Sequence, residues 1–307
     1  SMPRYDAREL AQERCRREGG VLLLASATPS MRSFAMAGRG DLTLLEMPHR
    51  VHNRPMPTVH VVDMREELKK GNRSVFSGEL VNGLSRCLKE GMQAILFVNR
   101  RGFSTFVSCR NCGYVVTCDQ CDVSMTYHSV ENVLRCHYCG QEKNIPTVCP
   151  ECGSPYIKYF GVGTQRVEEE VKKIFPNVST LRMDNDTTRT KDAHATLLDQ
   201  FRRGEAKILV GTQMIAKGLD FPNVTMVGIV AADAMLKLPD YRSAERTFQL
   251  LTQVAGRAGR ADAQGEVYLQ TYDPENYAIE AASRQDYRAV CEAEMRRRRQ
   301  ALYPPYT

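Results

Sequence analysis

"KILVGTQMIAKGLDFPNVTMVGIVAA", residues 207–232, contains two short apolar runs, 207–212 and 224–232, separated by glycine, aspartate and proline. Runs of Val, Ile and Leu that are bounded by turn residues are typical of strands buried on both faces of a parallel sheet. Further runs of this kind lie at 21–26, 94–99, 179–184 and 265–271. The sequence therefore predicts a parallel sheet.

Helical patterns lie between these runs. The clearest one starts at Ser77, a residue type that caps helix N-termini, and stops before Gly91, so it predicts a helix over 77–90. Further helices are expected over 165–175, 190–203 and 243–255. Strands that alternate with helices predict an α/β fold.

The composition is that of an ordinary globular protein. Of 307 residues, 42% are hydrophobic and 25% are charged, and 42 basic against 36 acidic residues give a net charge of +6. The arginine run at 296–299 is typical of a solvated helix face. No run approaches the roughly 18 apolar residues of a membrane span, and the first residues lack a signal peptide, so we expect a cytoplasmic protein with no membrane partner.

Eight of the 11 cysteines form four Cys-x-x-Cys pairs. In a reducing compartment such pairs bind metal rather than form disulfides. A tetrahedral zinc ion takes four thiolates at about 2.3 Å, so the four pairs predict two zinc sites. In chain order the pairs are Cys109 and Cys112, Cys118 and Cys121, Cys136 and Cys139, and Cys149 and Cys152.

The spacing favours a nested arrangement of these pairs. Five residues separate Cys112 from Cys118, which leaves little room to reverse the chain, whereas fourteen separate Cys121 from Cys136, enough for a hairpin. We therefore expect pairs two and three on one zinc ion and pairs one and four on the other. A cross-braced arrangement, with pair one beside pair three and pair two beside pair four, remains open.

Other metal chemistry is open to the same cysteines. They could bind iron–sulfur clusters, and His128 or His137 could replace a thiolate, although eight cysteines already complete two sites. All-thiolate sites are closed to substrate, which indicates a structural metal. Glycine or aspartate follows each pair, and these residue types tolerate a left-handed turn. They are Gly113, Asp122, Gly140 and Gly153.

The stretch 108–155, named here the cysteine module, interrupts the α/β pattern, which resumes after it. It has no helical period and many turn residues. We expect a small zinc-ribbon-like insertion in the sheet domain, held together by its metals.

Small residues follow two of the predicted strands. Ser26 and Thr28 lie at the carboxyl end of one apolar run, and Gly211 and Thr212 lie at the end of another. In open α/β sheets ligands bind at the carboxyl edge of the strands, where amides and hydroxyls can hold phosphates. Either stretch alone is also common in structural turns.

Two arginines, Arg257 and Arg260, lie three residues apart in "QLLTQVAGRAGR". On a helical turn both guanidinium groups face one side, and Gly256 and Gly259 remove bulk beside them. Two fixed cations suit a phosphate whose charge spreads in a transition state, the arginine-finger role. The alternative is a pair of surface arginines at a helix end.

Four stretches resemble, in order, the third to sixth motifs of superfamily 2 helicases: "SATPS" (26–30), "ILFVNRRGFS" (95–104), "VGTQMIAKGLDFP" (210–222) and "QVAGRAGR" (253–260). The cysteine module lies between the fourth and fifth. This order is similar to that of the bacterial primosomal replication-restart helicases, whose second motor lobe carries an eight-cysteine, two-zinc insertion there. The resemblance implies a RecA-like parallel-sheet helicase lobe with an inserted module of two four-cysteine zinc sites.

The same resemblance implies an ATP-dependent helicase of 3′ to 5′ polarity that restarts replication at stalled forks. Its implied partners are single-stranded and forked DNA, primosome proteins and single-stranded-DNA-binding protein, with the cysteine module engaging the fork and partner proteins. The resemblance also implies roles for single residues. The DNA backbone would be contacted by Thr212, Thr164 and Arg166, and the nucleotide would be faced by Gly218 and Asp220. The ATP site would be completed by Gln253, Arg257 and Arg260, and the nucleotide state would be coupled to the binding of DNA by Ser26 and Thr28.

One departure from that family is large. Neither the Gly-x-x-x-x-Gly-Lys-Ser/Thr loop that holds phosphates nor the Asp-Glu pair that holds magnesium occurs in the sequence. We therefore expect ATP and Mg²⁺ to be bound by the full-length protein, and we do not expect this chain alone to hydrolyse ATP. The alternative is a non-catalytic, zinc-stapled module that binds DNA or protein.

The resemblance also implies five segments. They are 1–50, the tail of lobe one with the third motif; 51–107, the start of lobe two; 108–155, the double-zinc module; 156–290, the remainder of lobe two; and 291–307, the start of a truncated C-terminal domain.

Overall fold

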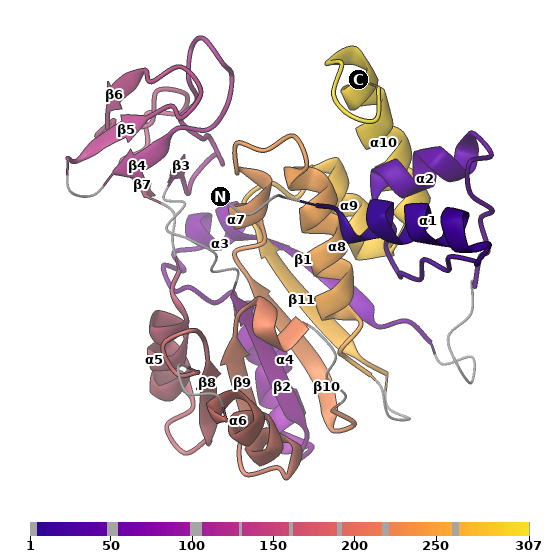
Figure 1. Cartoon of the computed structure of the whole chain (residues 1–307). Coiled ribbons are helices and arrows are strands. Elements are labelled where there is room, and N and C mark those ends of the chain that lie inside the picture. Colours follow the sequence, from indigo (N-terminus) through magenta and orange to yellow (C-terminus); the bar gives the residue numbers. More distant parts are fainter. Residues whose placement is uncertain are drawn as a thin grey trace.

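The computed structural model describes residues 5–47, 55–98, 106–128, 131–159, 162–188, 192–216, 221–259 and 264–306. Its centre is a parallel sheet of six strands in the order β1-β11-β10-β2-β9-β8 (Figure 1). The strands are β1 (Thr58–Asp63), β2 (Gln93–Val98), β8 (Thr180–Met183), β9 (Ile208–Gly211), β10 (Val224–Val230) and β11 (Glu266–Thr271). Every residue of β2, β9 and β10 is buried, because helices cover both faces of the sheet.

Helices form a layer on each face of this sheet. On one face, α4 (Gly78–Lys89) and α5 (Thr164–Ile174) pack against the strands. On the other face lie α6 (Ala193–Arg202), α8 (Ser243–Ala255) and α9 (Tyr277–Arg284). The short elements α3 (Met64–Lys69), α7 (Asp233–Leu236) and the 3-10 helix η2 (Gln213–Ala216) lie in the connections.

Most of the predicted elements are confirmed. Five apolar runs became β2, β8, β9, β10 and β11, and the four predicted helices became α4, α5, α6 and α8. Ser77 caps α4, since its hydroxyl accepts a hydrogen bond from the amide of Leu80 at 3.2 Å. The edge strand β1 was not predicted, because a strand with only one paired neighbour needs no continuous apolar run.

The predicted strand at 21–26 is wrong. These residues have no strand pairing, and Val21 and Leu23 are 95% and 76% exposed. A strand needs a neighbouring backbone to satisfy its amides and carbonyls, and no segment of the described residues pairs with this one. Its apolar side chains therefore lie on the surface.

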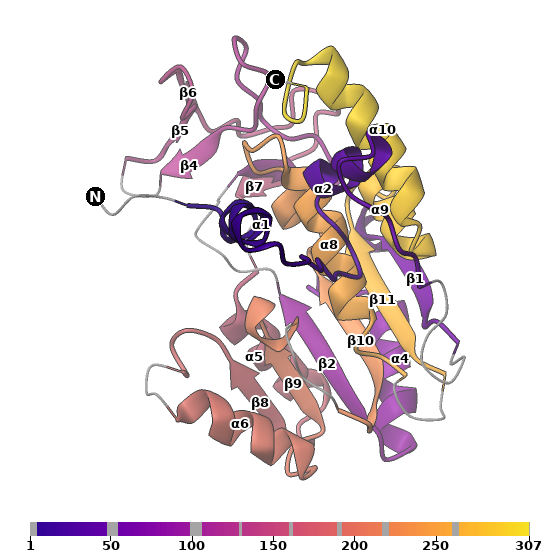
Figure 2. The ribbon, with the colours of Figure 1, turned by 45° about the vertical axis from the view of Figure 1, so that its right-hand side comes forward.

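The N-terminal segment nevertheless packs on the sheet domain. It contains α1 (Ala7–Glu18) and α2 (Met31–Gly38), and Figure 2 shows α2 beside α10 (Tyr287–Gln300). Met31 is buried in the main core, and the ring of Phe34 meets that of Tyr287 edge to face at 5.4 Å.

The C-terminal helix α10 belongs to the same packed body. Val290 and Cys291 are buried in the main core, so the division expected at residue 291 falls inside this helix. Of the arginine run at 296–299, Arg298 is buried. In the part of the chain described here, no helix is long and apolar enough to cross a membrane.

The cysteine module lies at one end of the sheet domain, between β2 and α5 in the chain (Figure 1). Two small antiparallel sheets lie in the module and in the residues that flank it. One pairs β3 (Val107–Cys109) with β7 (Ile157–Tyr159), and the other joins β4 (Thr126–His128), β5 (Val133–Arg135) and β6 (Glu142–Asn144).

Candidate metal centres and nucleotide-facing residues

Each Cys-x-x-Cys pair closes a tight turn. The amide after the second cysteine donates to the carbonyl of the first cysteine at 2.8–3.0 Å. That amide belongs to a residue with a positive φ of 52–83° in all four turns, and the four residues are Gly113, Asp122, Gly140 and Gly153. The predicted left-handed turns are therefore confirmed, and three of the four use glycine, which adopts this conformation without steric cost.

The eight thiols form two groups of four, and within each group the sulfur atoms lie within 4.8 Å of one another. One group contains Cys109, Cys112, Cys149 and Cys152, and the other contains Cys118, Cys121, Cys136 and Cys139. The structure thus shows the nested arrangement and not the cross-braced one.

The spacing of the sulfur atoms fits zinc. The Sγ–Sγ distances are 3.7 Å for Cys109 and Cys152, and 3.5 Å for Cys118 and Cys139. A tetrahedral site with Zn–S bonds of about 2.3 Å requires sulfur atoms about 3.8 Å apart. Each group can therefore hold one Zn²⁺ with little rearrangement.

Strand pairing decides which cysteines meet. Because β3 pairs antiparallel with β7, Cys109 lies opposite Ile157, and pairs one and four meet at the base of the module. Between pairs two and three, β4 and β5 reverse the chain within the fourteen-residue interval. The hairpin predicted from the spacing is therefore present.

Cysteines form much of the interior of the module. Its buried cluster consists of Val107, Val116, Met125, Leu134 and Ile157 together with Cys109, Cys118, Cys136 and Cys149. Few apolar side chains are fully buried in this cluster, so metal bound by the thiols would add to its stability.

One thiol in each group has a lowered pKa, so that it ionises near neutral pH. A hydrogen bond from the Asn111 side chain lowers the pKa of Cys152 to about 6, and the backbone amide of Cys139 lowers the pKa of Cys136 to about 7. The thiolate is the form that binds metal. His128 and His137 belong to neither group; their rings pack against each other at 5.2 Å.

The cysteine module contacts the sheet domain closely. Phe106, just before the module, and Ala231 form a small buried cluster against which Val115 of the module and Tyr272 pack. Gly113, in the first turn, lies so near that an added Cβ would sit 2.6 Å from the carbonyl oxygen of Tyr272. Glycine is thus required at this position by the contact as well as by the turn.

Replacing this glycine should weaken the contact. Gly113→Ala should cost about 1–2 kcal/mol for its left-handed backbone and about 1–3 kcal/mol more for the clash with Tyr272. Gly140→Ala is the matched control, because Gly140 has a similar φ of 78° but nothing within 4 Å of its added Cβ. Urea unfolding of the zinc-loaded chain measures both, and equal losses of stability would contradict the close contact.

The carboxyl edge of the sheet gathers several predicted residues. Thr212, after β9, is 6% exposed. Thr164 begins α5 and is fully buried, and its hydroxyl donates to Asp184, which follows β8, at 2.5 Å. Burial alone would raise the pKa of Asp184, but the bond from Thr164 and those from nearby amides hold it below its usual value. The Thr164 hydroxyl is thus used in a buried hydrogen bond within the sheet domain, whereas Arg166 is exposed.

The arginine motif follows the end of α8. The helix stops at Ala255, and the amides of Arg257 and Ala258 bond back to carbonyls three residues earlier, which tightens the turn. Arg257 is half-buried and Gln253 is exposed. Arg260, Gly218 and Asp220 lie outside the described residues.

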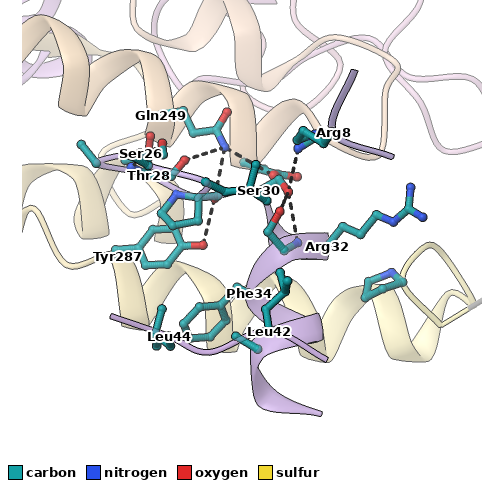
Figure 3. Close-up of a pocket in the computed structure, with 18 of the residues that line it drawn as sticks. Arg8, Ser26, Thr28, Ser30, Arg32, Phe34, Leu42, Leu44, Gln249 and Tyr287 are labelled. Atoms are coloured by element: carbon teal, nitrogen blue, oxygen red, sulfur yellow. Dashed lines mark hydrogen bonds between the residues drawn. The ribbon is translucent and has the colours of Figure 1, made fainter. Parts of the chain in front are cut away.

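An open pocket of about 2560 Å³ lies between the N-terminal segment and helices α8 and α10 (Figure 3). Ser26, Thr28 and Gln253 all line it, so the structure brings these three predicted residues to one pocket. Thr28 is buried and Ser26 is exposed. Thr212, Thr164 and Arg166 do not line this pocket.

A buried ionic cluster beside the pocket was not predicted. Arg298 of α10 donates to Glu245 of α8 and to Glu294, both at 2.8 Å, and the three residues are 3–6% exposed. Burial opposes a charged guanidinium, but the two carboxylates hold the pKa of Arg298 above its usual value. The only sequence signal is that Val290, Glu294 and Arg298 are spaced four apart and so share the buried face of one helix.

Two family models match the chain. The PriA DNA helicase Cys-rich region (CRR) domain matches residues 118–143, and the Helicase conserved C-terminal domain matches residues 157–262. Replication restart protein PriA of Bacillus subtilis is 54% identical over 305 residues, which are 99% of this chain and 38% of that protein. The protein of the same name from Synechocystis is 52% identical over 312 residues, with the same two shares.

Solved structures resemble the chain less closely. RecG bound to a three-way DNA junction has a TM-score of 0.45 at 17% identity and covers 91% of this chain and 27% of that chain. S. cerevisiae Dbp5 bound to RNA and ADP BeF3, in its L327V form, has a TM-score of 0.44 at 15% identity and covers 92% of this chain and 55% of that chain.

The chain contains a parallel sheet that matches the helicase C-terminal domain, and a cysteine-rich module with two groups of four thiols interrupts this sheet domain after β2. These features define the chain as a helicase C-terminal lobe with a metal-binding insertion. This confirms the predicted fold class. Within that class, the chain belongs to the family of the replication restart protein PriA. It spans 38% of the length of the Bacillus and Synechocystis relatives.

Proposed function

We propose that this chain is part of an ATP-dependent DNA helicase that moves 3′ to 5′ on single-stranded DNA and acts at stalled replication forks to restart replication. The observation that carries the proposal is the 54% identity to a replication restart protein over 99% of the chain. Single-stranded and forked DNA would be its substrates, and the cytoplasm its compartment.

In this proposal the candidate residues have separate roles. Gln253, Arg257 and Arg260 complete the ATP site by contacting the phosphates, with Gly218 and Asp220 facing the nucleotide. Thr212 and Arg166 contact the DNA backbone, and the α5 N-terminus at Thr164 contributes backbone amides rather than its buried hydroxyl. Ser26 and Thr28, which share a pocket with Gln253, couple nucleotide state to DNA grip.

The remaining parts of the ATP site would come from the whole protein. The chain contains no phosphate-binding loop and no Asp-Glu pair, so ATP and Mg²⁺ would be bound with residues outside it, and alone it would not hydrolyse ATP. The exposed apolar side chains of Val21 and Leu23 support assignment of 1–50 to the tail of lobe one, whose sheet would cover them. The other proposed divisions are 51–107, 108–155, 156–290 and 291–307.

The cysteine module would serve recognition rather than chemistry. Two Zn²⁺ ions in closed four-cysteine sites leave no open coordination position for a substrate. The module would therefore present a rigid surface to the fork, to primosome proteins and to single-stranded-DNA-binding protein. A second candidate function, a non-catalytic zinc-stapled module that binds DNA or protein, is favoured for the isolated chain by the missing phosphate loop.

The two functions are separated by comparing the whole protein with this chain. The whole protein should hydrolyse ATP in the presence of single-stranded DNA and unwind duplexes from a 3′ tail, whereas this chain should show neither activity because it lacks the phosphate loop. The measurements are phosphate release and strand separation on forks with a 3′ or a 5′ tail. Unwinding from the 5′ tail only, or no DNA-stimulated hydrolysis by the whole protein, would contradict the proposal.

A further inference from the structure

Glu245 is a buried carboxylate that holds together parts of the chain far apart in sequence. One oxygen, Oε1, accepts a hydrogen bond from the backbone amide of Met31 at 2.9 Å. The other, Oε2, accepts one from Nη2 of Arg298 at 2.8 Å. The side chain therefore joins the N-terminal segment, α8 and α10 at a single point.

The loop that Glu245 holds, from Thr28 to Met31, contains Thr28, one of the two candidate coupling residues. Tyr287 of α10 donates its hydroxyl to the carbonyl of Pro29 at 2.9 Å, and Gln249 of α8 makes longer contacts to the carbonyls of Thr28 and Pro29, at 3.4 and 3.5 Å (Figure 3). Three side chains, two of them from α8, thus fix the backbone from Thr28 to Met31.

The same face of α8 leads to the candidate ATP residues. Glu245, Gln249 and Gln253 are spaced four apart, so they lie on one side of the helix, and all three line the pocket. Arg257 lies just after α8 ends at Ala255, in a turn that its amide ties to the carbonyl of Val254. Because a helix moves as a rigid element, a displacement at its arginine end is carried to the loop that Glu245 holds.

Further buried contacts hold the ionic partners of Glu245 in place. Arg298 is also held by Glu294 at 2.8 Å, and Glu294 in turn accepts a hydrogen bond from the hydroxyl of Tyr277 in α9 at 2.5 Å. Removing one partner would leave a buried charge without compensation, which is strongly destabilising. The loop is therefore anchored to a rigid group of helices and not to a flexible side chain.

We propose that Glu245 is a positioning residue that ties the Thr28–Met31 loop to α8, so that the loop and the arginine motif move together when nucleotide is bound or hydrolysed. This inference rests on the proposed function. Glu245 itself touches neither nucleotide nor DNA in this role; it acts through Met31 and Arg298.

The test uses Glu245→Gln in the whole protein. The amide has one acceptor oxygen, so it can satisfy either Met31 or Arg298 but not both. DNA-stimulated kcat for ATP hydrolysis should fall by about fivefold or more, the range of an ordinary coupling between sites, while KM for ATP changes by less than about twofold. A merely structural role would lower the midpoint of thermal unfolding without this split between kcat and KM.

Four further variants complete the design. Arg298→Met should reproduce the loss of kcat and Arg298→Lys should restore part of it, because lysine keeps the charge. Arg296→Met, which removes an exposed arginine from the same helix, is the control and should behave as wild type. If the charge variants do not fold, Gln249→Met removes the contacts to Thr28 and Pro29 without leaving a buried charge, and it should lower kcat in the same way.

The outcomes distinguish this inference from the proposed function. Wild-type protein without DNA-stimulated ATP hydrolysis would overturn the proposed function and the inference that rests on it. Active wild-type protein together with folded Glu245→Gln and Gln249→Met variants of unchanged kcat would overturn the inference alone.

Discussion

Replacing Arg257 by alanine in the whole protein is expected to lower kcat for DNA-stimulated ATP hydrolysis by about 10³-fold or more. The guanidinium stabilises charge that develops on the transferred phosphoryl group, an interaction that is stronger in the transition state than in the bound substrate. The KM for ATP should therefore change much less than kcat. Arg260→Ala should have an effect of similar size if both cations face the same phosphate.

The matched control for these variants is Arg203→Ala. Arg203 is exposed at the end of α6 and pairs with Asp199 and Glu205 on the surface, so its loss should leave the ATP hydrolysis unchanged. Steady-state phosphate release at saturating single-stranded DNA measures all three variants. Wild-type kcat in both Arg257→Ala and Arg260→Ala would show that the pair is a surface feature of the helix end.

Removing the second and third cysteine pairs together should leave one zinc ion bound to the chain. In the nested arrangement this change, Cys118→Ala with Cys121→Ala, Cys136→Ala and Cys139→Ala, abolishes one site completely and leaves the other intact. Apparent binding free energies of structural zinc are about 10–16 kcal/mol, so the intact site should survive purification. Metal analysis of freshly purified protein gives the count, which should be two for wild type.

The control for this experiment removes pairs one and two instead. The variant Cys109→Ala with Cys112→Ala, Cys118→Ala and Cys121→Ala takes half of each site in the nested arrangement, so it should retain no tightly bound zinc. A cross-braced arrangement would lose both ions in both variants. A sequential arrangement, pairs one with two and three with four, would keep an ion only in this second variant.

The predictability of the sheet depended on burial. β2, β9 and β10 are covered on both faces, and such strands produce continuous apolar runs that are recognisable without any knowledge of their neighbours. The run at 21–26 has the same composition, yet it forms no strand here because a strand also requires a partner backbone, and composition does not supply one. Residues 58–63 form β1 without such a run, because they pair with β11 alone.

The candidate site shows the same difference between features that depend on neighbouring residues and features that depend on distant ones. The Cys-x-x-Cys spacing and the residues after each pair were sufficient to predict the four turns, since each turn depends on a few consecutive residues. The resemblance predicts that Thr164 contacts the DNA backbone, but it could not predict that the Thr164 hydroxyl donates to Asp184, which lies 20 residues away. The run at 296–299 indicated a solvated face, but Arg298 is buried because carboxylates from α8 and α10 meet it there.

By itself the sequence determined the local features of this protein: the apolar strands, the capped helices, the thiol pairs and the turns that shape them, because each depends on interactions between residues close along the chain. Only the tertiary structure decided which thiol pairs come together in each group of four, how the cysteine module sits against Tyr272, and that Glu245 joins Met31 to Arg298. The separation along the chain is 21 positions for Cys118 and Cys139 and 214 positions for Met31 and Glu245. Such contacts arise when separate elements pack, and a period within one element can predict which of its faces is buried but not which distant residue meets it there.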